Sequence, residues 1–287
     1  MTNQVAGIDP EKYKNATRDQ WNKSGAGYNA WGHVVDDLIR GGKDWMIEMT
    51  GITEGSRVLE LAAGGGLLSL SLARQVGPQG SVLATDLAPE ILAFTAQNAQ
   101  AAGLSNVETR EMDGEEVDVP EGSFDAVVSS LGLMFFPNPL KSLQGQMRAL
   151  RPGGKVAALV FSTPDKNPFF SLPAKIIRER ANLPMPQPGM PGPFALGAPG
   201  LLADLFSKAG LRDVTSETMT TGVKLPSADE HLRLLRDAFG ALHMMMTGMD
   251  DAEKQATWAA VHEAMQPFQG ADGFQSPAEI IVCAGTR

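Results

Sequence analysis

Residues 58–73 read VLELAAGGGLLSLSLA, a run of three glycines between two apolar segments. The segment before the glycines has the short apolar pattern of a buried strand, and LLSLSLARQV after them has the spacing of a helix. A flexible linker would be polar, so this order predicts a ligand-binding loop at the end of a buried strand. A nucleotide P-loop is excluded, because no Gly-Lys-Ser/Thr follows the glycines.

Alternating strands and helices continue downstream of this loop. Helices are predicted at 89–103 and 139–150. The predicted strands that follow the first are 81–87, 106–113, 124–131, 155–162 and 278–286, and residues 198–219 are predicted to form a further helix and strand. Most of these strands are nearly continuous apolar runs, which is typical of a parallel sheet covered on both faces. The sequence therefore predicts an α/β fold, a doubly wound and mostly parallel seven-stranded Rossmann-like sheet.

Two regions outside this alternation are predicted to cover the sheet. Residues 1–50 have amphipathic helical spacing and are interpreted as an N-terminal helical lid, and 51–287 as the main domain. Residues 164–199 hold nine of the nineteen prolines, and 227–246 are predicted to form one helix. We expect insertions 164–199 and 226–270 to form a helical and Pro-rich substrate cap.

Composition narrows the class of partner. The chain has 287 residues, 43% hydrophobic, and a formal net charge of -9, so nucleic acid is not an expected partner. No apolar run reaches the length of a membrane span, and the polar N-terminus does not resemble a signal peptide. One cysteine, Cys283, excludes an internal disulfide, and no metal-ligand spacing is present. We expect a cytoplasmic protein, and a homodimer is left open.

The glycine loop alone is compatible with two kinds of cofactor. Gly64-x-Gly66-x-x-Ser69 nearly matches the dinucleotide fingerprint, and Asp86 follows at the distance of a ribose-binding acid. Glu60 lies just before the loop, where a carboxylate would repel a pyrophosphate and would attract a positively charged ligand. The residues therefore favour a cationic cofactor, with an NAD(P)-dependent oxidoreductase as the alternative.

The segment Glu60-Leu-Ala-Ala-Gly-Gly-Gly66 resembles the acidic residue and glycine loop of the class I S-adenosylmethionine-dependent methyltransferases. Asp86 ends the second predicted strand, Met112-Asp113-Gly114 follows the third, and RPGG precedes the fifth, all in the order of that family. Ala62 replaces the first glycine of the loop. Within the family, the chain is most similar to the small-molecule branch that includes the ubiquinone/menaquinone-biosynthesis C-methyltransferases and natural-product O-methyltransferases.

This resemblance implies S-adenosylmethionine as the cofactor. Asp86 would accept both ribose hydroxyls, Asp113 would accept the adenine amino group, and the glycines would let the backbone approach closely. The full set of expected cofactor-binding residues is Tyr28, Trp31, Glu60, Ala62, Gly64, Gly66, Asp86, Leu87, Asp113, Gly114, Ser129 and Ser130.

The acceptor side is expected to be apolar. Met134, Phe135, Phe136 and Phe239 are candidate contacts of a small, hydrophobic or aromatic methyl acceptor. His33 and His243 are candidate catalytic bases for O- or C-methylation, whereas His231 and His262 are expected at exposed helix positions. A non-catalytic cofactor-binding protein is the remaining alternative.

Overall fold

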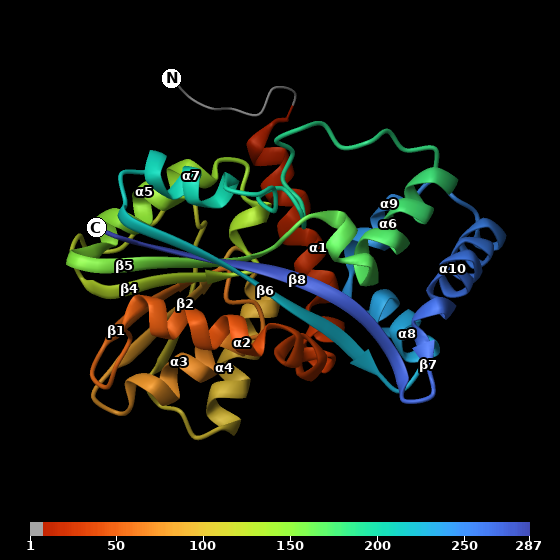
Figure 1. Ribbon diagram of the computed structural model, residues 1–287. Coiled ribbons are helices and arrows are strands. Elements are labelled where there is room, and N and C mark those ends of the chain that lie inside the picture. The colour runs from red at the N-terminus through yellow and green to blue at the C-terminus, as the bar shows by residue number, and fades with distance from the viewer. Residues whose placement is uncertain (1–7) are drawn as a thin grey trace.

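The computed structural model describes residues 8–287, which are built around one mixed sheet (Figure 1). Its strand order is β3-β2-β1-β4-β5-β8-β6, and β7 pairs with β8 outside this path. The strands are β1 (Arg57–Leu61), β2 (Ser81–Asp86), β3 (Val107–Glu111), β4 (Phe124–Ser130), β5 (Leu150–Phe161), β6 (Arg212–Leu225), β7 (Gln269–Gly270) and β8 (Gly273–Thr286).

The first five strands are parallel to one another, and β8 runs antiparallel to both β5 and β6. Strand β1 lies in the middle of the parallel part, and its residues Val58, Leu59 and Leu61 are completely buried. This explains the apolar run before the glycines, because a central parallel strand is covered on both faces. The predicted Rossmann-like sheet is confirmed, with seven strands in its main path.

Helices cover both faces of the sheet, as a doubly wound fold requires (Figure 1). Helices α2, α3 and α4 lie on one face, and α5 and α7 lie on the other. Their bounds are α2 (Gly32–Thr50), α3 (Leu67–Val76), α4 (Pro89–Ala101), α5 (Pro139–Ala149) and α7 (Leu201–Lys208).

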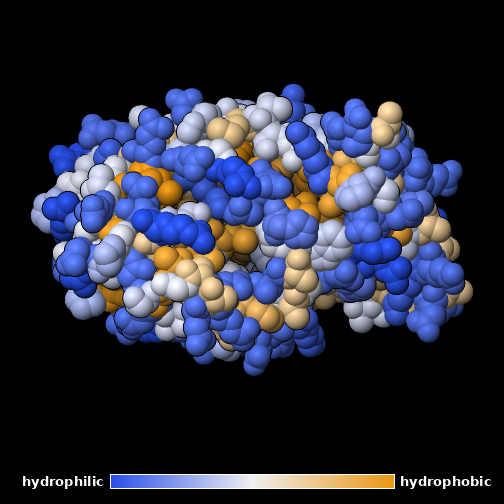
Figure 2. Space-filling model, turned by 90° about the horizontal axis from the view of Figure 1, so that it is seen from below, coloured by the Kyte–Doolittle hydropathy of each residue, from blue (hydrophilic) through white to orange (hydrophobic). Residues whose placement is uncertain are grey.

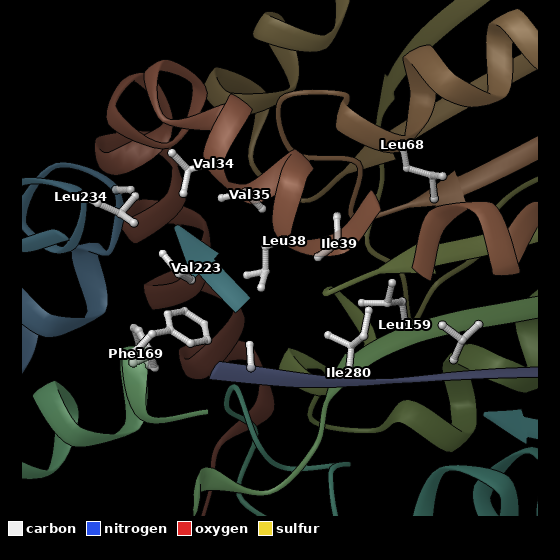
Figure 3. Close-up of a cluster of buried hydrophobic side chains, with 14 of the residues drawn as sticks. Val34, Val35, Leu38, Ile39, Leu68, Leu159, Phe169, Val223, Leu234 and Ile280 are labelled. Carbon is white, nitrogen blue, oxygen red and sulfur yellow. The ribbon is translucent and has the colours of Figure 1, made fainter. Parts of the chain in front are cut away.

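Helix α2 supplies much of the larger hydrophobic core. Figure 3 shows Leu38 and Ile39 of this helix directed toward Leu159 of β5 and Ile280 of β8. A side chain at Gly42 would meet Leu159 and Ile280 within about 2.6 Å, so the helix and sheet approach each other closely there. Because α2 packs this closely and buries its apolar face, it contributes to the hydrophobic core beneath the sheet.

A second group of helices lies beside the end of the sheet. It contains α6 (Pro168–Arg180), α8 (Ala228–Ala238), α9 (Gly240–Met245) and α10 (Asp251–Met265), with short 3-10 turns at Pro164–Lys166 and Gln266–Phe268. A third 3-10 turn, Leu133–Phe135, follows β4 and contacts β5 and α5. The single helix predicted over 227–246 is wrong. The chain leaves helical geometry at Phe239 (φ -109°, ψ 75°), and Gly240 starts a new helix.

Helix α1 (Pro10–Ala30) connects these two parts of the molecule (Figure 1). A side chain at Gly25 would lie 3.0 Å from Ile91 of α4, and one at Gly27 would lie 1.9 Å from the backbone of Asp237 in α8. These glycines therefore let α1 pack against the sheet domain on one side and the helical group on the other.

The surface is mostly hydrophilic in the view of Figure 2, with hydrophobic side chains visible mainly in recesses between polar ones. Across residues 8–287, no helix is both long enough and apolar enough to cross a membrane.

Candidate functional site

A cavity of about 680 Å³ opens above the carboxyl ends of β1, β2 and β4. Helix α1 forms one wall, and α6, α9 and the Pro-rich segment after α6 form the opposite one. A ligand site outside the carboxyl ends of parallel strands is the expected position in a doubly wound fold.

The glycine loop between β1 and α3 forms the floor of this cavity. Ala62, Gly64 and Gly66 all have positive φ angles, 56°, 55° and 86°. The Thr95 hydroxyl donates to the Gly64 carbonyl at 2.7 Å, and Asn98 donates to the Gly65 carbonyl at 2.9 Å. Two side chains of α4 therefore fix the loop, and Ala62 adopts a conformation that normally favours glycine.

Glu60 lies at the end of β1 and is 1% exposed. It accepts a hydrogen bond from the Ser69 hydroxyl, and it lines the cavity. The pKa of Glu60 is raised to about 8, mainly by burial and in part by the nearby Asp86, whereas the Ser69 hydrogen bond and Lys43 oppose the rise. In the absence of a ligand, Glu60 is therefore largely protonated at neutral pH, and a bound cation would favour its ionised form.

Asp86 is the last residue of β2, and the backbone orients its carboxylate. One oxygen accepts from the Gly64 amide at 2.9 Å, and the other accepts from the Ala88 amide at 2.9 Å. Burial raises the pKa of Asp86, while these amide donors act in the opposite direction. Asp86 thus joins the glycine loop to the start of α4 and also faces the cavity.

Asp113 follows β3 and meets a basic residue that the sequence did not single out. Lys14 of α1 lies 2.7 Å from Asp113 and 2.6 Å from Glu115, and all three line the cavity. Arg18, one helical turn further, donates to the Leu87 carbonyl at 3.0 Å. Lys14 and Arg18 lie four residues apart on the helix face that covers the site, a spacing that could have marked them.

Aromatic side chains line the opposite part of the cavity. The four expected acceptor contacts, Met134, Phe135, Phe136 and Phe239, all lie there. Four further phenylalanines complete this wall, Phe161, Phe169, Phe170 and Phe194. The sequence did not single them out individually, although the last three lie in the predicted cap segment 164–199. Their rings pack on one another, with Phe161 to Phe169 at 5.6 Å and Phe170 to Phe239 at 5.0 Å between ring centroids.

Most of the expected cofactor residues are brought together. Nine of the twelve line the cavity, namely Tyr28, Glu60, Ala62, Gly64, Asp86, Leu87, Asp113, Gly114 and Ser130. Gly66 and Ser129 lie beside it without lining it. The indole of Trp31 donates to Asp237 at 3.1 Å instead of facing the cavity.

The strand-end hydroxyls are notable because nothing in the described chain satisfies them. The Oγ atoms of Ser129 and Ser130 are buried and have no hydrogen-bond partner within residues 8–287. Ser130 lines the cavity, so its hydroxyl is available to a bound molecule.

The candidate histidines lie elsewhere. His33 faces a separate polar depression beside Lys43, on the other side of the glycine loop. His243 bonds the Arg236 carbonyl at 2.7 Å and packs beside Trp258. Neither ring lines the cavity.

The expectation for His231 is wrong, because its side chain is completely buried. Its Nε2 atom lies 2.9 Å from the carbonyl of Phe169, and its ring stacks on Phe274 at 4.4 Å. Pro173, four residues after Phe169 in α6, has no N–H for that carbonyl. His231 therefore donates the hydrogen bond that a proline inside the helix cannot.

Comparison with known proteins identifies the family. Residues 36–178 match the ubiE/COQ5 methyltransferase family, a range that contains the glycine loop and all three strand-end carboxylates. The chain belongs to this family of class I S-adenosylmethionine-dependent methyltransferases. Membership implies S-adenosylmethionine as the cofactor.

The ubiquinone/menaquinone biosynthesis C-methyltransferase UbiE of Pseudomonas aeruginosa is 33% identical over 140 residues. The match covers 47% of this chain and 55% of that protein, so the chain spans about half the length of the curated relatives it matches. The family match, residues 36–178, contains the cofactor half of the fold, ends within α6 and leaves out α8, α9 and α10.

Two solved structures share the fold at low sequence identity. The phosphoethanolamine N-methyltransferase 2 of Haemonchus contortus aligns with a TM-score of 0.59 and 15% identity, covering 99% of this chain and 61% of that one. The [4+2]-cyclase SpnF aligns with a TM-score of 0.52 and 17% identity, covering 92% and 95%. Because these proteins carry different activities in their names, the fold alone does not define the reaction.

Proposed function

We propose that this protein transfers the methyl group of S-adenosylmethionine to a small molecule with a hydrophobic or aromatic body. The observation that carries the proposal is one cavity with two unlike halves. Carboxylates at the carboxyl ends of three adjacent parallel strands face one half, and phenylalanine and methionine side chains line the other. Such a division suits a polar, cationic cofactor beside an apolar acceptor.

The residues present fit the cofactor by their chemistry. Asp86 is oriented by two backbone amides and offers acceptors to a pair of ribose hydroxyls. Asp113 offers an acceptor to the adenine amino group, and Glu60 offers a negative charge to the cationic end. Ser130 supports this fit, because its buried hydroxyl has no partner within the described chain.

When bound, S-adenosylmethionine supplies an electrophilic methyl group on a positively charged sulfur. The protein's contribution to such a displacement is mainly alignment of the acceptor and exclusion of water. Trp21 supports this contribution, because its ring packs edge-on against Tyr28 at 5.2 Å and Phe135 at 6.4 Å in the cavity wall. Aromatic faces there would stabilise a cation.

Tyr28 would act as a neutral hydrogen-bond donor in this site. Burial raises the pKa of Tyr28 to about 12, and the charge of Asp86 adds to the rise. The phenol therefore keeps its proton at neutral pH and can orient an oxygen of either ligand.

The regions around the apolar half would serve as the substrate cap. Helix α1 covers the cavity on the cofactor side, and residues from 164–199 and 226–270 enclose the acceptor side. We assign the cap role to these regions because they contribute most of the aromatic wall. The same placement would let acceptor specificity change without altering the glycine loop.

Two measurements, made one after the other, test the proposal. Calorimetry should detect binding of S-adenosylmethionine and S-adenosylhomocysteine, and labelled methyl groups should then appear on members of a panel of hydrophobic aromatic acceptors. Asp86→Ala should weaken binding by about 1–3 kcal/mol, because charge-assisted hydrogen bonds are lost. Asp118→Ala, an exposed carboxylate after β3, is the matched control.

Different results would identify the alternatives. Binding of NAD(P) in place of S-adenosylmethionine would refute the proposal. Tight cofactor binding without transfer to any acceptor would indicate a non-catalytic cofactor-binding protein.

A further inference from the structure

Arg178 is distinctive among the cations of α6, because it alone lines the cavity. Phe170, Ala174 and Arg178 are spaced by four residues, so they share one face of the helix, and all three line the cavity. With a rise of 1.5 Å per residue, the Cα atoms of Phe170 and Arg178 lie roughly 12 Å apart along the axis.

The two ends of this helix face differ in depth. Phe170 is 8% exposed and packs against Phe194 and Phe239. Arg178 is half-buried, and the next part of the Pro-rich segment, including Leu183 and Pro186, is exposed at the mouth of the cavity. The wall of α6 therefore runs from an aromatic interior to a cationic rim.

The other cations of α6 already have partners outside the cavity. Lys175 lies 3.8 Å from Glu179, and the guanidinium of Arg180 donates to the Thr257 hydroxyl at 3.0 Å. Within residues 8–287, no carboxylate lies within 4 Å of the Arg178 guanidinium.

One hydrogen bond holds the Arg178 guanidinium at the rim. Its Nη1 atom donates to the Pro184 carbonyl at 2.7 Å. A guanidinium has five N–H donors in a planar fork, so a single carbonyl leaves most of that fork available. An anchored guanidinium without an acidic partner is well suited to bind a carboxylate through two parallel hydrogen bonds.

We propose that Arg178 is a specificity-determining residue that binds a carboxylate on the methyl acceptor. This inference rests on the proposed function and narrows its substrate class. The acceptor would be an amphiphile whose apolar or aromatic body contacts Phe170, Phe194 and Phe239. Its acidic group would lie roughly 12 Å further along α6, the span of eight residues.

The test compares matched ligands that differ only in charge. Dissociation constants are measured by tryptophan fluorescence for a panel of aryl and arylalkyl carboxylates of increasing length, each with its carboxamide, in saturating S-adenosylhomocysteine. We expect the best carboxylate to bind at least tenfold tighter than its carboxamide. Arg178→Met should abolish this preference, whereas Lys175→Met, on the exposed side of the same helix, should retain it.

The outcomes separate this inference from the function on which it rests. Failure of the unmodified protein to bind S-adenosylhomocysteine would refute the proposed function. Normal binding of that product with no preference for any carboxylate, or a preference that survives in Arg178→Met, would overturn the role of Arg178 alone. Arg178→Gln provides a second neutral variant, and thermal unfolding of both variants reports whether they fold.

Discussion

Lys14 and Asp113 form an ion pair of 2.7 Å between the first helix and the residue that follows β3. The carboxylate that would accept the adenine amino group is therefore already paired with a residue of the helix that covers the site. Glu115, whose side chain is almost completely buried, lies 2.6 Å from the same ammonium group. Lys14 thus fastens α1 to the cofactor half of the cavity.

Lys14→Met should weaken the attachment of α1 to the cofactor half of the cavity. We expect S-adenosylhomocysteine to dissociate about fivefold faster, because a partly buried charged hydrogen bond contributes about 1 kcal/mol. Stopped-flow tryptophan fluorescence measures this rate, since Trp21 lines the cavity. The free energy of unfolding should also fall by about 1–3 kcal/mol, because the buried Glu115 carboxylate loses its cationic partner.

Lys12→Met is the matched control for this experiment, because Lys12 is exposed on the same helix. It should leave both the dissociation rate and the stability unchanged. An unaltered dissociation rate in Lys14→Met would mean that α1 does not control release of the cofactor.

Glu60 should make cofactor binding depend on pH. Its pKa of about 8 in the free protein arises from burial, with a further contribution from Asp86. A cationic cofactor favours the ionised form, so binding should release a proton below pH 8. Affinity for S-adenosylmethionine should therefore rise between pH 6 and pH 8, by at most about tenfold per pH unit.

Calorimetry in buffers of different ionisation enthalpy measures this proton release directly. Glu60→Gln should bind more weakly at pH 8 and should lose most of the pH dependence. Glu108→Gln, an exposed change on β3, should behave like the unmodified protein. Equal proton release by Glu60→Gln would assign the titration to another group.

His231 should make the folded state less stable in acid. Burial lowers the pKa of His231 to about 4 from an ordinary value of 6.5, although its bond to the Phe169 carbonyl acts in the opposite direction. The unfolded chain gains a proton below pH 6.5 and the folded chain does not. The free energy of unfolding should therefore fall by about 2 kcal/mol between pH 7 and pH 5 from this group.

Urea unfolding at the two pH values measures this difference. His231→Gln keeps a donor in place of Nε2 and cannot titrate, so its stability should vary less with pH. His262→Gln changes a more exposed histidine of α10 and serves as the control. The same pH dependence in His231→Gln would contradict the assignment.

The bond between His231 and Phe169 should become less important once Pro173 is replaced. Pro173→Ala restores the N–H that the Phe169 carbonyl lacks, so His231→Leu should destabilise the Pro173→Ala protein less than the unmodified protein. A double-mutant cycle of unfolding free energies measures the coupling, for which we expect about 1 kcal/mol. Additive effects would show that the proline does not create the demand for a histidine.

The cofactor half of the site could be predicted from sequence because its residues lie at the ends of consecutive parallel strands. Glu60 and Asp86 lie at the ends of short apolar strands, Asp113 follows the polar edge strand β3, and the sheet brings all three positions to one edge. Local sequence patterns are sufficient to predict a site when the backbone topology alone brings its residues together.

The acceptor half could be predicted only in part, because its expected residues line the cavity but other members of its wall were not singled out. Arg178 and Phe170 belong to a segment whose many prolines suggested an excursion from regular structure, yet 168–180 form a helix. A proline is compatible with the first turn of this helix, and the side chain of His231 compensates for the second proline, which lies inside the helix. The burial of His231 could not be predicted for the same reason, because this side chain bonds a carbonyl that lies 62 residues earlier in the sequence.

Helix α1 touches both halves of the cavity, with Lys14 on the cofactor side and Trp21 against Phe135 on the acceptor side. A movement of this helix that admits one ligand also displaces the part of the cavity wall that contacts the other ligand. We therefore expect the two ligands to enter in a fixed kinetic order, cofactor first, so that the helix closes over it and completes the surface that receives the acceptor.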